Sequence, residues 1–406
     1  MLHMKRRTFL QMASGAALAA TFASRGLAED GPIRIGILND QTGPYSDQSG
    51  PGSVVAARMA VEDVGGKVLG RPVEVLVGDH QNKADIGVGI AREWFGPGNV
   101  SMIADFANSS IALGVRELLE PMGKIALYTG VSTTQLIGEA CSPYGVLWAH
   151  DTWAISAGLV RAAMAQGAKS FYFITADYSF GHSLQNDAAG AVTEGGGTVV
   201  GTTLHPLNTT DFSSYLLSAR SSGADAILLA NAGADLTNCL KQAAEFGVTK
   251  RQKVLTPLMF IVDVHSLGLE IAQGLTFTQS WYWDLDDTTR AWSKRYFDVM
   301  GKHAGDAQIA CYSAVLQYLK AVERAGTLDN DAVMKEMRAA TIQDAFTQNG
   351  RIREDGKMVF DRLLVRAKSP EESKYPWDYL EILSRIPASE AFRPLEMSAE
   401  CSMVKL

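Results

Sequence analysis

The chain has 406 residues, of which 47% are hydrophobic and 20% are charged, and its formal net charge at pH 7 is −7. Nucleic-acid-binding proteins usually carry a basic patch or stripe, and no basic run follows residue 28, so we expect no nucleic-acid partner. No apolar run after residue 28 reaches the roughly 20 residues that a transmembrane helix needs.

The N-terminus has the three parts of a secretory signal. Lys5, Arg6 and Arg7 form a basic start, residues 12–23 form a short apolar run, and small residues end the segment at Ala28. This order is typical of a cleaved signal peptide, and paired arginines followed by Phe-Leu indicate the twin-arginine type. We therefore expect residues 1–28 to be removed on export, with cleavage near Ala28, and a periplasmic location for the rest.

From residue 29 onward, short β-type runs alternate with amphipathic helical stretches. In the first part of the chain we expect strands at 33–38, 73–77, 100–104 and 124–128, and helices at 52–64, 84–95 and 112–122. After about residue 150 the alternation starts again, with strands at 170–174, 198–203, 226–230 and 254–256, and helices at 153–166, 183–194, 211–221 and 235–246. A third stretch, residues 280–357, carries two long helices, 288–303 and 308–325. Strands that alternate with helices predict parallel sheets wrapped by helices, so the fold class is α/β with two such units.

Four cysteines are too few for a disulfide framework, and none forms a CxxC pair. Cys239 and Cys311 lie in helical patterns and are expected to be buried. Cys141 and Cys401 lie in polar, irregular stretches. In an oxidising compartment we predict that these two cysteines form a disulfide.

The loops that follow the predicted strands are the places to look for a site, because ligands of open parallel sheets bind outside the carboxyl ends of the strands. These loops are rich in Ser, Thr, Asn, Gly and aromatic residues and nearly free of Lys, Arg and His. The sequence contains no phosphate-binding loop, nucleophile elbow or HExxH zinc motif. We therefore expect no catalytic residue, no metal site and no cofactor.

Five short segments, in order, resemble one family. They are Asp40-Gln41-Thr42-Gly43-Pro44-Tyr45 and the segments 105–110, 129–133, 177–181 and 242–247. The chain resembles the leucine/isoleucine/valine-binding proteins, which have the type I periplasmic binding fold. The resemblance implies two doubly wound parallel-sheet lobes, joined by a three-strand hinge, with a ligand cleft between them. It places residues 29–149 with 280–357 in lobe 1, and residues 150–279 with 358–406 in lobe 2.

The resemblance also implies which residues bind the ligand. A carboxylate is expected on N–H and hydroxyl groups of the loops after the third and fourth strands, which here are Ser109 or Ser110, Gly130 and Ser132. Amides at a helix N-terminus donate to an anion, so no arginine is needed. The same serines can instead, or at the same time, cap the helices that follow.

Aromatic side chains on the matching loops are expected to wall an apolar pocket, since ligand pockets are mostly apolar with a few fixed polar groups. These residues are Tyr45, Phe106, Tyr178 and Phe180.

One segment departs from the amino-acid binders of the family, which hold the ligand ammonium with an acid in a loop of the second lobe. The corresponding residues 258–262 contain no acid, and Asp263 and Asp235 are both placed to cap helices. A buried ammonium without a partner is costly. Two ligand classes therefore stay open: a branched-chain amino acid, if one of these aspartates turns inward, and a carboxylate without an amine, such as an aromatic acid.

Together these features predict a monomeric solute-binding component that passes its ligand to the membrane permease subunits of an ABC importer. Two alternatives remain at this point. One is a ligand-sensing subunit of a membrane receptor, which would share the fold. The other is an exported hydrolase, which would need an activated nucleophile.

Overall fold

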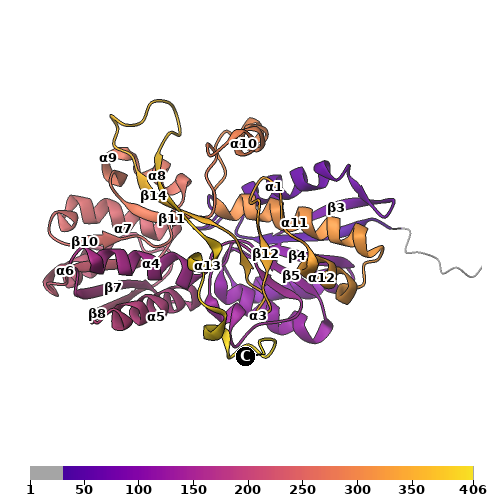
Figure 1. Ribbon diagram of the computed structural model, residues 1–406, viewed down its shortest axis with the longest axis horizontal. Coiled ribbons are helices and arrows are strands. Elements are labelled where there is room, and N and C mark those ends of the chain that lie inside the picture. Colours follow the sequence, from indigo (N-terminus) through magenta and orange to yellow (C-terminus); the bar gives the residue numbers. More distant parts are fainter. Residues whose placement is uncertain (1–30, 406) are drawn as a thin grey trace, which may run out of the picture.

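The computed structural model describes residues 31–405, which form two α/β lobes lying side by side (Figure 1). The first lobe is built on a six-stranded sheet in the order β2-β3-β1-β4-β5-β6, parallel except at β2. Its strands are β1 (Ile33–Asn39), β2 (Lys67–Val68), β3 (Arg71–Asp79), β4 (Val100–Asp105), β5 (Ile125–Tyr128) and β6 (Gly145–Leu147). Its helices are α1 (Gly50–Asp63), α2 (Ala84–Phe95), α3 (Ser109–Leu119), α10 (Asp287–Met300), α11 (Asp306–Ala325) and α12 (Asn330–Ala339).

The second lobe is built on a four-stranded parallel sheet in the order β10-β9-β7-β8. Its strands are β7 (Ser170–Ala176), β8 (Thr198–His205), β9 (Ala226–Ala230) and β10 (Lys253–Leu255). Its helices are α4 (Thr152–Ala165), α5 (Ser179–Glu194), α6 (Ser213–Ser221), α7 (Gly233–Glu245), α8 (Ile261–Leu267) and α9 (Leu269–Ala272). None of the helices within residues 31–405 combines the length and the apolarity required to cross a bilayer.

The central strands of both sheets are apolar on both faces because helices cover both sides of a parallel sheet. In β1, Ile35 and Ile37 pack into the core shared with α1 and α11, and Leu38 packs on the opposite face with α3. In the second lobe, Phe171 and Phe173 of β7 are fully buried. Each lobe therefore has its own hydrophobic core, as the α/β prediction requires.

The chain passes between the lobes three times: after β6, after β11 (Thr276–Gln279), and between β13 (Met358–Val359) and β14 (Arg362–Ala367). β11, β14 and β15 (Leu380–Ile386) form an antiparallel sheet that the strand-helix alternation did not predict. β13 forms a two-stranded ribbon with β12 (Arg351–Ile352). Short one-turn elements complete the list: η1 (Glu120–Met122), η2 (Thr134–Ile137), η3 (Val248–Lys250), η4 (Leu395–Ser398) and α13 (Ala388–Ala391).

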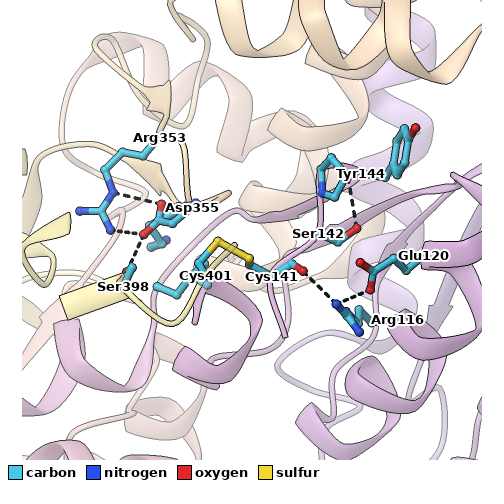
Figure 2. The surroundings of a disulfide bond; sticks show 12 residues. Arg116, Glu120, Cys141, Ser142, Tyr144, Arg353, Asp355, Ser398 and Cys401 are labelled. Atoms are coloured by element: carbon cyan, nitrogen blue, oxygen red, sulfur yellow. Dashed lines mark hydrogen bonds and ion pairs between the residues drawn. A yellow bond between two sulfur atoms is a disulfide. The ribbon is translucent and has the colours of Figure 1, made fainter. Parts of the chain in front are cut away.

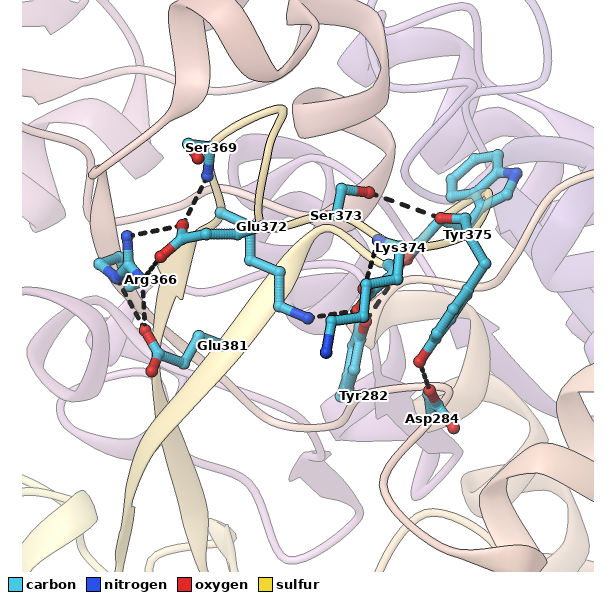
Figure 3. A network of polar contacts seen from close by, with 12 residues as sticks. Tyr282, Asp284, Arg366, Ser369, Glu372, Ser373, Lys374, Tyr375 and Glu381 are labelled. Atoms are coloured by element: carbon cyan, nitrogen blue, oxygen red, sulfur yellow. Dashed lines mark hydrogen bonds and ion pairs between the residues drawn. The ribbon is translucent and has the colours of Figure 1, made fainter.

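Ion pairs hold the loop between β14 and β15 (Figure 3). Arg366 of β14 donates to Glu372 in the loop at 2.7 Å and to Glu381 of β15 at 2.8 Å. Farther along the loop, the Tyr375 hydroxyl donates to Asp284, which follows the crossover from β11. The loop is therefore fixed both to its own hairpin and to the chain that leads into α10.

The C-terminal segment leaves the second lobe and returns to the first. Ala391 and Phe392 belong to the hydrophobic core of the first lobe. Beyond them, Cys401 forms a disulfide with Cys141, and both cysteines are buried (Figure 2). The predicted disulfide is confirmed, and it ties the last residues to the lobe that the prediction did not assign to them.

Breaking this disulfide should destabilise the protein. The bond joins cysteines 260 positions apart, and removing a native disulfide typically costs about 2–5 kcal/mol. We expect Cys401→Ser to lower the free energy of unfolding by about that amount in urea titrations. Dithiothreitol should lower the stability of the wild type similarly and leave the variant unchanged. Equal stability of variant and wild type would contradict a structural role for the bond.

Candidate functional site

A small cavity of about 30 Å³ lies where loops of the two lobes meet. This volume is well below the roughly 300–1,000 Å³ of small-molecule sites, so the lobes must move apart to take up a ligand. The residues that line the cavity are Tyr45, Gln48, Ser49, Ala107, Ser109, Gly130, Val131, Ser132, His150, Tyr178, Phe180, Ala232, Leu258, Phe260 and Ala307. Six of the eight predicted site residues are therefore brought together, and Phe106 and Ser110 are not among the lining residues.

The loop after β4 has an unusual backbone. Asp105, Phe106 and Ala107 all have positive φ, at 88°, 75° and 49°. Each residue of this kind costs of order 1–3 kcal/mol and persists only where its surroundings hold it. Here the Phe106 N–H donates to the Leu38 carbonyl at 2.7 Å, and the Phe106 carbonyl accepts from His80 Nε2 at 2.7 Å.

The Asp105 carboxylate holds three neighbouring loops together. It accepts from Asn39 Nδ2 at 2.7 Å, from Ser49 Oγ at 2.8 Å and from Thr129 Oγ1 at 3.1 Å. Burial raises the pKa of this fully buried carboxyl group, and the hydrogen bonds from Asn39 and the hydroxyls oppose that rise. The ends of β1, β4 and β5 are thus fixed relative to one another at the cavity.

The twisted loop turns Phe106 away from the cavity. Its ring is fully buried and packs against Tyr128, with ring centroids 5.1 Å apart. The prediction that Phe106 walls the pocket is therefore wrong. Ala107, the third of the three residues with positive φ, lines the cavity instead.

Free donors cluster at the first-lobe end of the cavity. The N–H groups of Ser109, at the start of α3, and of Ser132 make no hydrogen bond to any residue within 31–405, and neither do their hydroxyls. Asn108, not a serine, caps α3 by accepting from the Ile111 N–H at 3.1 Å. Unpaired N–H groups at a helix N-terminus are a suitable site for an anion.

Two other predicted donors are already engaged. The Gly130 N–H donates to the Asp105 carbonyl at 3.1 Å, so it is not available to a carboxylate. A Cβ at Gly130 would lie 2.5 Å from Asp105 Oδ1, so glycine is required here for close packing. The Ser110 hydroxyl donates to Ser179 Oγ of the second lobe at 3.0 Å rather than lining the cavity.

Aromatic side chains close the opposite side. The hydroxyls of Tyr45 and Tyr178 are 2.8 Å apart, and the Phe180 ring centroid lies 5.8 Å from that of Tyr178. Burial raises the pKa of both tyrosines, so both hydroxyls stay protonated at neutral pH. This side of the cavity is therefore apolar, except for the paired hydroxyls of Tyr45 and Tyr178.

The lobes are in contact across the cavity, so this is a closed arrangement. Tyr45 and Ala107, from the first lobe, pack within the hydrophobic core of the second. Besides the Tyr45–Tyr178 pair, Gln48 Nε2 donates to the Asp263 carboxylate at 3.1 Å. Side chains of both lobes would have to separate to admit a ligand.

Neither aspartate considered for an ammonium lines the cavity. Asp263 accepts from the Phe260 N–H at the start of α8, at 2.8 Å, which agrees with the predicted helix-capping role. The predicted capping role of Asp235 is wrong: α7 begins at Gly233 without a side-chain cap, and Asp235 accepts from the Asn208 N–H at 3.2 Å. None of the lining residues is acidic.

The stability of the closed form should depend on pH through Asp263. Burial raises the pKa of Asp263 to about 7, against opposing hydrogen bonds from Phe260 and Gln48. A group with a raised pKa binds its proton more tightly in the folded chain, so its contribution to stability falls as pH rises from about 4 to about 7. Relative to Asp263→Asn, the wild type should lose on the order of 3 kcal/mol of unfolding free energy between pH 5 and pH 8.

Urea titrations at several pH values measure this difference. Asp211→Asn is the matched control, because Asp211 is exposed and its pKa is lowered by hydrogen bonds from Ser213. That carboxyl is ionised in both states above pH 5, so the control should show no such trend. A constant difference between wild type and Asp263→Asn from pH 5 to pH 8 would contradict a raised pKa.

Several lining residues were not predicted from the sequence. Leu258 and Phe260 belong to the segment 258–262, in which only an acid was expected to contact a ligand. Gln48 and Ser49 follow Tyr45 in the loop after β1. His150 was not predicted as a lining residue, because it follows β6, a three-residue strand that the sequence pattern did not predict.

Within residues 31–405, no group of three or more His, Cys, Asp or Glu side chains is arranged to hold a metal ion. The predicted signal segment, residues 1–28, lies outside the described residues.

Known proteins resemble this chain along most of its length. A solved periplasmic binding protein from Burkholderia mallei is 44% identical, with a TM-score of 0.90, over 92% of this chain and 99% of that one. A branched chain amino acid ABC transporter periplasmic ligand-binding protein from Burkholderia xenovorans LB400 is 40% identical, with a TM-score of 0.81, over 91% of this chain and 99% of that one.

Among curated proteins, the Leu/Ile/Val-binding protein homolog 6 of Brucella abortus (strain 2308) is 27% identical over 217 residues. These residues are 52% of this chain and 54% of that protein, so the chain spans about half the length of this curated relative. The family model described as "Periplasmic binding protein" matches residues 32–373, which is most of the chain. The chain belongs to the periplasmic binding protein family.

Proposed function

We propose that this protein is the solute-binding component of an ABC importer and that it encloses a small organic carboxylate without a cationic group between its lobes. The observation that carries the proposal is the pair of unengaged N–H and hydroxyl groups at Ser109 and Ser132, which face a cavity with aromatic walls. A carboxylate is an acceptor only, and these groups can donate to it. The ligand body then packs between Tyr178, Phe180 and Phe260.

The absence of acidic groups from the cavity lining favours an acid without an amine over an amino acid. Leu258 occupies the segment where the amino-acid binders of the family carry an acid, and Asp263 is engaged by Gln48 and the Phe260 N–H. An ammonium enclosed here would lose its hydration without gaining a charged partner. The importer role itself is supported by the B. xenovorans relative, whose description names an ABC transporter for branched-chain amino acids.

The remaining features fit a component exported to the periplasm. We assign residues 1–28 to a twin-arginine signal peptide cleaved near Ala28, which N-terminal sequencing of the exported protein tests. The monomeric protein would deliver its ligand to membrane permease subunits. We propose residues 29–149 with 280–360 as lobe 1 and residues 150–279 with 361–387 as lobe 2. This moves the expected boundary from 357 to 360, because Met358, Val359 and Phe360 pack in the core of the first lobe. We also join the residues from 388 onward to lobe 1, because Ala391 and Cys401 pack there.

A thermal-shift screen of the mature protein tests the proposed ligand class, because a ligand that binds only the folded state raises its apparent stability. The panel pairs each amino acid with the carboxylic acid of the same skeleton that lacks the amine, and adds benzoates. We expect one or more of the acids that lack an amine to stabilise the protein. Stabilisation by amino acids alone would overturn the assignment of an amine-free acid, and stabilisation by neither group would overturn the carboxylate assignment.

A further inference from the structure

His150 is a buried, polar lining residue to which the proposed function gives no role. It lies in the crossover after β6, and only 2% of it is exposed. The Thr152 N–H, two residues on, donates to the Ser132 carbonyl at 2.8 Å, so this crossover lies beside the loop with the proposed carboxylate donors. On the other side, the Phe260 ring centroid is 5.6 Å from the imidazole. His150 therefore lies where the carboxylate end of the cavity meets the second lobe.

The imidazole is uncharged at neutral pH. Burial lowers the pKa of His150 well below its ordinary value, and the positive charges of Arg362 and Lys357 lower it further. Its Nδ1 has no hydrogen-bond partner among residues 31–405, and the nearest carboxylate oxygen, Oδ2 of Asp306, is 3.9 Å away. A neutral imidazole offers one donor and one acceptor, and no hydrogen bond between Nδ1 and the protein fixes which of its two nitrogens carries the proton.

Two buried basic side chains, Arg362 and Lys357, lie near His150. Arg362 Nη1 donates to the Ala154 carbonyl at 2.9 Å, and Lys357 Nζ donates to the Ala149 carbonyl at 2.8 Å. Both side chains are almost completely buried. Asp306 and Asp151 are the acids that face Arg362. A ligand cation placed beside His150 would reach no carboxylate that lines the cavity.

We propose that His150 recognises an uncharged oxygen next to the ligand carboxylate, so that the preferred ligands are 2-oxo or 2-hydroxy acids with an aliphatic or aromatic body. This inference rests on the proposed function, because it assumes that Ser109 and Ser132 hold the carboxylate. The position next to the carboxylate then faces His150, Phe260 and Leu258. An oxo group accepts from an imidazole N–H, and a hydroxyl both donates and accepts, so either one pairs with the ring.

The same position disfavours the two related ligand classes. An ammonium carries a charge that no lining residue can pair. An unsubstituted acid leaves the buried imidazole without a partner, and an unmet buried polar group weakens binding. We therefore expect different affinities for four acids that share a skeleton and differ only in the group next to the carboxylate.

Calorimetric titration with 4-methyl-2-oxopentanoate, 2-hydroxy-4-methylpentanoate, 4-methylpentanoate and leucine tests the inference, with the corresponding phenyl series as a second body. We expect the oxo and hydroxy acids to bind about tenfold or more tightly than the unsubstituted acid and leucine. His150→Ala should remove this preference, because the oxo and hydroxy acids lose their partner and the unsubstituted acid no longer leaves an imidazole unpaired. His150→Gln, which keeps a donor and an acceptor, should retain part of it.

His265→Ala is the control, because His265 is exposed and stacks on Trp377, away from the cavity lining. If no carboxylate in either series binds, the proposed function fails. If the acids bind but the wild type shows no preference for the 2-oxo and 2-hydroxy acids, or His150→Ala preserves that preference, the role of His150 fails and the proposed function stands.

Discussion

Replacing Ser132 with alanine should weaken binding of the carboxylate ligand by roughly 5- to 150-fold, which corresponds to about 1–3 kcal/mol. The Ser132 hydroxyl is buried and has no partner among residues 31–405, so its expected partner is the ligand. Its removal leaves one carboxylate oxygen short of a donor inside a closed cavity. Calorimetric titration with the tightest acid from the thermal-shift screen measures the change.

The control is Ser110→Ala. The Ser110 hydroxyl is bonded to Ser179 of the other lobe and does not line the cavity, so its loss should alter affinity less. Urea titration should show that Ser132→Ala unfolds at nearly the same denaturant concentration as the wild type. Unchanged affinity in a folded Ser132→Ala protein would refute the carboxylate assignment.

A disulfide placed across the cleft should stop ligand exchange. Ser110 Oγ and Ser179 Oγ are 3.0 Å apart and belong to opposite lobes. Oxidation of the double variant Ser110→Cys/Ser179→Cys should lock the lobes together, because the two replaced side chains already meet in the closed form. In stopped-flow experiments, ligand added after oxidation should associate at least about 100-fold more slowly than before, since binding then requires a state that the bond forbids.

Reduction should restore the association rate of the double variant. The single variant Ser110→Cys controls for the loss of the serine, and it should respond to neither oxidation nor reduction. The reductant must be mild enough to spare the buried Cys141–Cys401 bond, which peptide mapping checks. Fast association with the oxidised double variant would mean that the ligand enters without separation of the lobes.

Most of the fold could be predicted from the sequence, because its strands and helices follow local hydrophobic periods. The strand predicted at 226–230 matches β9, and the helix predicted at 84–95 matches α2. The antiparallel sheet of β11, β14 and β15 could not be predicted in this way. Its pairs, such as Phe277 with Val365, join segments far apart in the chain, and no local pattern specifies such a pairing.

The return of the C-terminal segment to the first lobe was missed for a related reason. Residues after 387 form only short turns, so they show no period that indicates which core they join. Their attachment depends on tertiary contacts, such as those of Phe392 in the core, Ser398 with Asp355, and Cys401 at the disulfide. The disulfide could be predicted because the polar, irregular surroundings of both cysteines and an expected export signal can be read from the sequence.

The site was predicted at the level of loops and less well at the level of atoms. The rule that ligands lie beyond the carboxyl ends of strands marked the loops, and the resemblance to the leucine/isoleucine/valine-binding proteins implied Tyr45, Ser109, Ser132 and Tyr178 within them. The hydrogen bond from the Gly130 N–H to the Asp105 carbonyl could not be predicted. It depends on a backbone with positive φ values, and no residue type in the loop indicates them. Which of several adjacent groups faces a cavity is decided by tertiary contacts.

The central claim is that a small carboxylate without an amine lies between the lobes with its charged end on Ser109 and Ser132. A crystal structure of the mature protein with the tightest acid from the thermal-shift screen tests it most directly. We predict the carboxylate oxygens within hydrogen-bonding distance of the Ser109 and Ser132 N–H groups, with the body against Tyr178 and Phe260. A ligand bound outside this cavity, or one that places its carboxylate at the Tyr45–Tyr178 edge, would contradict the account.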